Sequence, residues 1–185
     1  MTTSSKAKPV RKRRRYKARF FVIMICLISA IVYGAFRSFS GLPDTRTYID
    51  PYARIDSLDE LDEKTREAAL LFLEIAEDRG LDVIVTETYR TQERQDYLYA
   101  KGRTAPGSIV TWTKDSRHTR RNAFDIAKNV PGHEYDDPEF FRKCAEIAKS
   151  IGLTAGYYWE PNQDMPHFET DIFTRIKYPD GYKKP

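Results

Sequence analysis

Apolar and polar residues alternate with helical spacing over residues 57–80. Ser57-Leu-Asp-Glu60 has the pattern of a capping box, in which the first side chain caps the helix and the last reaches back to it. Apolar residues then recur every three or four positions, and Gly80 is typical of the residue just beyond a helix end. The pattern predicts a helix with one buried face.

Shorter elements are predicted after this helix. Residues 81–87 (LDVIVTE) alternate and are rich in β-branched side chains, which indicates a strand, and residues 91–100 indicate a second helix. Asp137-Pro138 is a favourable start for a third helix, which should stop at Gly152. Short strands are expected at three further runs, 109–112, 122–127 and 167–170. Because helices and strands mix without regular strand–helix–strand alternation, we expect a small α+β domain with an antiparallel sheet.

A separate apolar run, residues 20–36 (FFVIMICLISAIVYGAF), contains 17 residues and no charge. As a helix it would rise about 25 Å, a little under the roughly 30 Å of a bilayer core. Nine basic residues precede it and only Arg37 closely follows, so the positive-inside rule places the N-terminus in the cytoplasm. We therefore expect a basic cytoplasmic tail (1–19), one transmembrane anchor (20–36), a linker (37–56) and an exported domain (57–185).

Two alternatives to an anchor exist for this run. A cleavable signal peptide is the first, because Val32 and Gly34, or Ser38 and Ser40, are small enough for a poor cleavage site. The long basic region and the lack of an Ala-x-Ala motif favour an uncleaved anchor. A buried core helix is the second alternative, but the run has neither an amphipathic pattern nor a cap.

The charge distribution excludes one class of partner. The chain has 185 residues, of which 41% are hydrophobic, and a formal net charge of +4. Ten of its 31 Lys and Arg lie in residues 1–43, which contain no acid, so residues 44–185 carry 21 basic against 27 acidic residues, a net charge of −6. Affinity for a polyanion would have to come from the tail alone. We therefore expect no nucleic-acid partner.

Two of the three histidines lie beside carboxylates. His118 lies within Ser116–Asp125 (SRHTRRNAFD) and His167 within Trp159–Glu169 (WEPNQDMPHFE). Two imidazoles and one carboxylate form a three-ligand set that leaves a fourth position for water, as a catalytic zinc site requires. Zinc lowers the pKa of such a water and polarises a scissile carbonyl, and Asp164 could take the proton.

The spacing alone also fits a competing interpretation, in which His118 and His167 are solvated surface residues. For His133, in the loop Pro131-Gly-His-Glu, we adopt that interpretation outright.

Three stretches resemble one enzyme family. Residues 116–125 (S-x-H-x-x-R-x-A-x-D), 164–168 (D-x-P-H-F) and 86–111 (TETYRTQERQDYLYAKGRTAPGSIVT) are similar to motifs of the peptidoglycan-cleaving zinc peptidases of the D-Ala-D-Ala carboxypeptidase/VanY group, peptidase family M15. Within this group the L-alanyl-D-glutamate endopeptidases of phage endolysins and bacterial wall enzymes are the most similar. The resemblance runs over roughly residues 57–170, and it implies a zinc peptidase domain.

The resemblance implies roles for individual residues. His118, Asp125 and His167 take the positions of the ligands of one Zn²⁺ ion. Asp164 occupies the position of the general base, and Arg90 that of an arginine near the substrate carbonyl, where a fixed guanidinium stabilises the negative charge of the transition state. A structural ion pair is the alternative for Arg90.

Further residues are expected around the site. By the same resemblance, Ser116 orients ligands or substrate, and Tyr89 and Trp159 are walls of the pocket or parts of the core. Arg121 stands where the family motif has glycine, so a backbone position that favours positive φ carries a long cationic side chain. The run Ala155–Trp159 replaces a glycine-rich stretch. These departures concern the fit of the substrate more than metal binding.

The implied activity is zinc-dependent hydrolysis of a peptide bond in peptidoglycan stem peptides, at L-Ala–D-Glu because Asp164-Met-Pro-His167 fits the endopeptidase branch. D-Ala–D-Ala carboxypeptidase activity is the alternative within the family. Two further alternatives are a non-catalytic zinc-containing module that binds the wall, and a phage lysin held at the membrane until release. The expected partners are peptidoglycan peptides and, through residues 20–36, a bacterial cell membrane, with the domain on the periplasmic or cell wall side.

Overall fold

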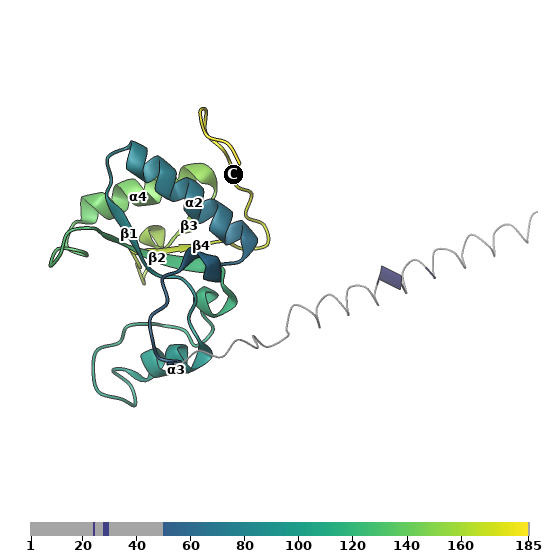
Figure 1. Ribbon diagram of the computed structural model, residues 1–185. Coiled ribbons are helices and arrows are strands. Elements are labelled where there is room, and N and C mark those ends of the chain that lie inside the picture. The colour runs from purple at the N-terminus through teal and green to yellow at the C-terminus, as the bar shows by residue number, and fades with distance from the viewer. Residues whose placement is uncertain (1–23, 25–27, 30–49, 185) are drawn as a thin grey trace, which may run out of the picture. The chain divides into compact units, whose positions relative to one another are not determined.

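The computed structural model describes residues 24, 28, 29 and 50–184 (Figure 1). The expected tail lies outside the described residues, as do the expected anchor apart from Met24, Ile28 and Ser29, and the linker before Asp50. Within the described residues, none of the helices has the length and apolar character needed to cross a bilayer. Residues 50–184 belong to one compact unit.

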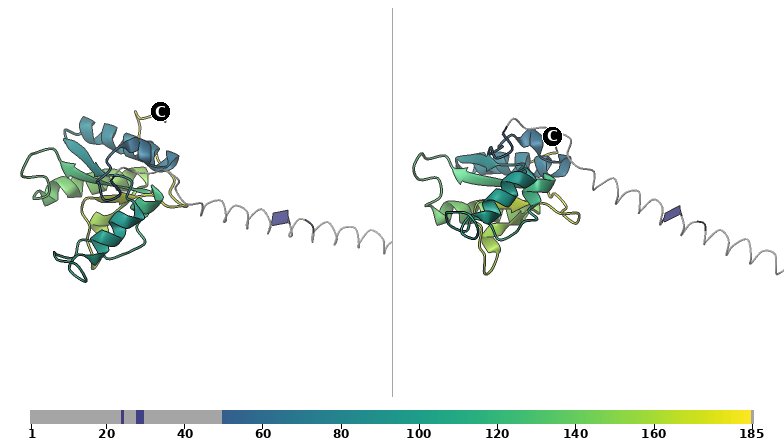
Figure 2. Two further views of the ribbon diagram at one scale, coloured as in Figure 1. Left: turned by 60° about the horizontal axis from the view of Figure 1, so that its bottom comes forward. Right: turned by 90° about the horizontal axis from the view of Figure 1, so that it is seen from below.

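A four-stranded antiparallel sheet forms the centre of this unit. Its strands, in spatial order, are β1 (Val83–Glu87), β2 (Ala123–Lys128), β4 (His167–Glu169) and β3 (Thr154–Ala155). Helices α2 (Glu63–Asp78) and α4 (Pro138–Ile151) pack together and cover one face of the sheet. Helix α3 (Gln92–Ala100) and the loop after it lie on the opposite side (Figure 1, Figure 2). The expected α+β class is confirmed.

The core lies between the sheet and the α2–α4 layer. Phe124 of β2 and Phe168 of β4 stack with their ring centroids 5.6 Å apart, and Phe72 of α2 packs on Phe168 at 5.1 Å. All three side chains are fully buried. Because side chains alternate along a strand, the neighbours of these phenylalanines project from the other face of the sheet. That face carries the polar residues described below.

Most of the predicted elements are present, with their caps. Asp137 caps α4 by accepting a hydrogen bond from the backbone of Phe140 at 3.0 Å, and Gly152 ends α4 with a φ of 91°. The first helix begins later than predicted. Ser57 caps only the 3₁₀ turn η1 (Leu58–Glu60), and Asp62 caps α2 through the backbone of Thr65.

The expected strand over 109–112 is wrong. This segment is an irregular loop, because no strand in the described part of the chain pairs with it. One of its backbone carbonyls is instead bound by a side chain: Arg103 donates to the carbonyl of Thr111 at 3.1 Å.

Residues 50–56, which we expected in the linker, are attached to the domain. The backbone N–H of Thr88 donates to the carbonyl of Ile55 at 2.6 Å, and the Thr88 hydroxyl donates to the carbonyl of Ser57 at 2.9 Å. Arg94 also donates to the carbonyl of Tyr52 at 2.8 Å. The chain is therefore fixed to Thr88 by hydrogen bonds where it enters the domain.

Candidate metal centre

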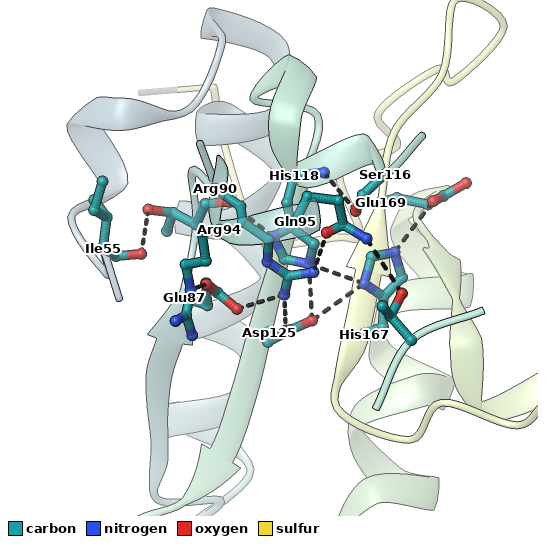
Figure 3. A network of polar contacts seen from close by, with 12 residues as sticks. Ile55, Glu87, Arg90, Arg94, Gln95, Ser116, His118, Asp125, His167 and Glu169 are labelled. Atoms are coloured by element: carbon teal, nitrogen blue, oxygen red, sulfur yellow. Dashed lines mark hydrogen bonds and ion pairs between the residues drawn. The ribbon is translucent and has the colours of Figure 1, made fainter. Parts of the chain in front are cut away.

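The pairing of β2 with β4 brings two candidate ligands together. Asp125 lies directly opposite His167 in the antiparallel register, and both residues occupy the face of the sheet that points away from Phe124 and Phe168. His118 comes from the 3₁₀ turn η2 (Arg117–Arg120), which leads into β2. Figure 3 shows the three side chains converging from these segments.

The three ligand atoms form a nearly equilateral triangle. His118 Nε2, His167 Nδ1 and Asp125 Oδ1 are separated from one another by 3.1 Å in each case. Zinc bonds of about 2.0–2.1 Å at tetrahedral angles place neighbouring ligand atoms about 3.3 Å apart. His118, Asp125 and His167 therefore form a group that could hold a metal ion.

Hydrogen bonds on the outer side of each imidazole establish which nitrogen is free. His118 Nδ1 lies 2.7 Å from the carbonyl oxygen of Thr88, which only accepts, so Nδ1 carries the proton. His167 Nε2 lies 3.1 Å from a carboxylate oxygen of Glu169 and donates to it in the same way. The inward nitrogens then offer lone pairs beside the Asp125 carboxylate, as in other metal sites with hydrogen-bonded outer nitrogens. This donor set fits a divalent cation such as zinc.

Without a metal, the group retains a proton. Burial would lower the pKa of His167, but hydrogen bonds to Asp125 and Glu169 raise it to about 9. Burial would raise the pKa of Asp125, yet the charges and hydrogen bonds of His118 and His167 hold it well below its usual range. The site therefore favours a bound cation, whether a proton or a metal.

Arg90 lines the same site and is also part of a buried ion-pair network. Its Nη1 donates to Gln95 Oε1 at 2.8 Å, its Nη2 pairs with Glu87, and Nη2 lies 3.6 Å from Asp125 Oδ2. Arg94 binds the other oxygen of Glu87 at 2.7 Å. Burial would raise the pKa of Glu87, but the two arginines lower it, so the carboxylate stays ionised. The Arg90 guanidinium is thus held in place beside Asp125.

Asp164 lies next to the three ligands, in the turn that leads into β4. Its backbone N–H donates to the carbonyl of Gly156 at 2.9 Å, and its carbonyl accepts from the backbone of His167 at 3.2 Å. Asp164 is exposed, and its carboxylate makes no hydrogen bond with the described residues. Partial loss of hydration and the negative charge of Asp125 raise the pKa of Asp164. A carboxylate in this state is suited to accept a proton.

A cleft of about 660 Å³ connects these groups. It is lined by the three ligands, by Arg90, Asp164, Ser116, Trp159 and Glu169, and by the loop 109–113. The Trp159 ring lies 5.1 Å from the His167 ring, so Trp159 is a wall of the cleft. Ser116 supports His118 by accepting a hydrogen bond from its backbone N–H at 3.3 Å.

Tyr89 is not brought to the cleft with the other candidates. Its ring is buried, and the Arg121 guanidinium lies 3.8 Å from the ring centroid. Tyr89 is therefore part of the core and not a wall of the pocket.

Arg121 adopts the backbone conformation that a glycine would favour, with a φ of 63°. Its side chain donates to the carbonyl of Glu60 at 2.7 Å, pairs with the Glu60 carboxylate and covers Tyr89. These contacts offset the strain of a left-handed non-glycine residue, which is about 1–2 kcal/mol. Arg121 does not occur among the described residues that line the cleft.

His133 lies apart from the metal centre. It is exposed and pairs with Asp136 at 2.6 Å, in agreement with the interpretation as a solvated surface residue.

Three residues support the site in ways that the motifs do not indicate, and one of them, Glu169, is considered from the sequence only as an alternative base. Glu169 could have been recognised as a support, because it lies two residues after His167 on one strand and therefore on the same face. Thr88 acts through its backbone carbonyl, which leaves no side-chain signal. Gln95 is a fully buried polar residue whose only sequence signal is its position one turn after the helix start.

Comparisons with known proteins confirm the resemblance that the motifs indicate. Residues 110–170 match a peptidase M15 family model described as D-alanyl-D-alanine carboxypeptidase. The chain is 35% identical over 106 residues to CwlK of Bacillus subtilis (strain 168), a peptidoglycan L-alanyl-D-glutamate endopeptidase. This match covers 51% of the chain and 64% of CwlK, so it spans less than two thirds of that relative.

Two solved structures share the fold. The L-Ala D-Glu endopeptidase ChiX of Serratia marcescens superposes with a TM-score of 0.51 at 19% identity, covering 65% of this chain and 91% of ChiX. The LD-carboxypeptidase LdcB superposes with a TM-score of 0.50 at 12% identity, covering 70% of each chain.

The protonation of His167 generates a pH prediction for the metal-free protein. Folding raises the pKa of His167 from 6.5 to about 9, so its contribution to the free energy of unfolding is fully present below pH 6.5 and is lost as the pH rises through 9. That contribution is at most about 3 kcal/mol. We expect the Tm measured in chelator to fall between pH 6.5 and 9, and to fall less with zinc, which replaces the proton. A Tm in chelator that stays constant between pH 6.5 and 9 would contradict the raised pKa of His167.

Gly156 generates a second prediction. A Cβ at this position would lie 2.5 Å from the Asp164 carbonyl oxygen and 3.2 Å from the His167 Cβ. Gly156→Ala should therefore displace the turn that carries both residues and weaken zinc binding by about 10- to 100-fold, measured by competition with a chelating dye. Gly132→Ala is the control for a substitution away from the site: its Cβ would meet nothing within 4 Å, and the strain that its φ of 82° imposes on alanine falls in the loop that contains His133, which lies apart from the metal centre. Equal zinc affinity in both variants would show that the close approach is not needed.

Proposed function

We propose that this protein is a zinc-dependent peptidase that hydrolyses a peptide bond in peptidoglycan stem peptides, and that the bond is L-Ala–D-Glu. The observation that carries the proposal is the triangle of His118, Asp125 and His167 in a cleft that also contains Asp164 and Arg90. A zinc ion held by the three ligands would activate a water molecule and polarise the substrate carbonyl.

The chain's own residues supply the remaining functions. Asp164 would accept a proton in the cleft and return it to the leaving amine, because its carboxylate is exposed there and has a raised pKa. Arg90 would supply a fixed positive charge for the oxygen that becomes negative in the transition state, since Glu87 and Gln95 hold its guanidinium. Glu169 would keep the His167 ring oriented.

Two observations bear on the choice of bond. Similarity to CwlK and the sequence Asp164-Met-Pro-His167 favour L-Ala–D-Glu. The description of the matching family model favours D-Ala–D-Ala, which is therefore the second candidate. Asp164 and Arg90 in the cleft disfavour a non-catalytic module, because a purely structural metal site needs neither.

Digestion of purified peptidoglycan with the full-length chain, followed by mass analysis of the fragments, tests the proposal. Peptides that begin with D-Glu support it, whereas loss of a terminal D-Ala favours the second candidate. If no fragment forms although zinc is bound, the result would favour the non-catalytic binding module over the peptidase.

The role of Asp164 generates a prediction on the same assay. Asp164→Asn removes the proton acceptor at nearly the same volume and replaces none of the three proposed ligands, so hydrolysis should fall by about two to four orders of magnitude while about one zinc per chain is retained. Elemental analysis measures the metal, and a His118→Ala/His167→Ala variant should lose it.

Glu169→Gln is the matched control for Asp164→Asn. The amide oxygen of Gln can still accept the hydrogen bond from His167, so most of the activity should remain. Full turnover by the Asp164 variant beside an inactive Glu169 variant would transfer the base role to Glu169.

We also propose that residues 20–36 anchor the chain in a bacterial cell membrane with the domain outside the cytoplasm. The support comes from the uncharged run and from the nine basic residues before it. A reporter that works only outside the cytoplasm should therefore be active when fused after Pro185. Mature chains released into the medium, beginning near residue 35 or 41, would favour a cleaved signal peptide.

A further inference from the structure

One wall of the cleft is apolar and exposed. Ile109, Val110 and Trp112 are 42%, 58% and 62% exposed, and all three line the cleft that contains the metal ligands. The segment 109–113 (IVTWT) contains no charged residue. Adjacent exposed apolar side chains on the wall of a cleft are typical of a ligand-binding surface.

This wall is held in place by the framework of the metal centre. Gln95 Nε2 donates to the carbonyl of Thr113 at 2.6 Å, while Gln95 Oε1 accepts from Arg90 at 2.8 Å. The Arg103 guanidinium binds the carbonyl of Thr111 and lies 5.8 Å from the Trp112 ring centroid. Trp112 is therefore exposed although hydrogen bonds hold its segment in place. The wall keeps a defined position relative to His118, Asp125 and His167.

The chemistry of the wall indicates the ligand. An uncharged aromatic and aliphatic surface suits a neutral group with C–H faces and methyl groups. On the proposed function, the residue before the scissile bond is L-Ala, whose amino group is joined to the lactyl group of N-acetylmuramic acid. This sugar is neutral once so joined, it offers a pyranose C–H face, and it carries N-acetyl and lactyl methyl groups.

We propose that Ile109, Val110 and Trp112 form a subsite for the N-acetylmuramic acid of the glycan strand, so that the enzyme prefers glycan-attached stem peptides over free ones. The inference rests on the proposed L-Ala–D-Glu cleavage. In D-Ala–D-Ala cleavage the sugar lies several residues from the scissile bond, and a sugar subsite beside the metal would have no role. A lipid surface on the same residues would cover the cleft and block the substrate.

The test compares two substrates with the full-length chain: a disaccharide-linked stem peptide, and the same peptide with an N-acetyl group in place of the sugars. We expect a higher kcat/KM for the disaccharide substrate. Trp112→Ala should reduce that kcat/KM by about tenfold, a typical effect of losing an aromatic contact, and should reduce the value for the sugar-free peptide much less. Trp112→Phe, which keeps an aromatic ring, should restore most of the difference. Phe173→Ala is the matched control, because Phe173 is 79% exposed and does not occur among the described residues that line the cleft.

A second measurement separates the subsite from the proposed activity. Calorimetric titration with N-acetylmuramyl-L-alanine should show binding that Trp112→Ala weakens to a similar degree. Equal losses of turnover on both substrates, or unchanged binding in Trp112→Ala, would overturn the subsite while leaving the peptidase intact. Trp112-dependent binding without turnover of either substrate would support the subsite and overturn the proposed function.

Discussion

The antiparallel pairing of β2 with β4 is the constraint on which the candidate site depends. It places Asp125 opposite His167, and it places Phe124 opposite Phe168 on the other face. Since a slip of one residue would exchange the two faces of a strand, the same register turns the phenylalanines into the core and the ligands toward the cleft. The stacked rings under α2 and α4 therefore stabilise the metal centre, because only the native register satisfies the core.

A second layer of polar groups orients the ligands from behind. The Thr88 carbonyl and the Glu169 carboxylate select the protonated nitrogen of each imidazole. Thr88 is itself held by the carbonyls of Ile55 and Ser57, so the segment that leads into the domain supports His118 from a distance. In this arrangement, a backbone carbonyl far away in the sequence orients His118, and a carboxylate two residues away orients His167.

The buried charges near the site are paired in a chain. One carboxylate oxygen of Glu87 pairs with Arg90 and the other with Arg94. Gln95 accepts a hydrogen bond from Arg90 and donates one to the carbonyl of Thr113 in the loop 109–113. A buried ion without a partner is strongly destabilising, and removal of Glu87 would take from Arg94 its carboxylate partner and leave Arg90 with Asp125 at 3.6 Å. The same contacts fix the position of the apolar wall relative to the metal ligands. One network thus holds both the Arg90 guanidinium and the surface that we propose for the glycan.

The sequence by itself determined the helices with their caps at Asp137 and Gly152, the alternating strands of the core, and the residue types of a candidate metal site. These signals are local, since they depend on neighbours a few positions apart. Only the tertiary structure decided that His118, Asp125 and His167 converge, that Tyr89 is buried under Arg121, and that helix α2 begins after Asp62. It also decided that residues 109–112 are an exposed wall instead of a strand, because an apolar, β-branched run becomes a strand only when another strand offers its backbone hydrogen bonds.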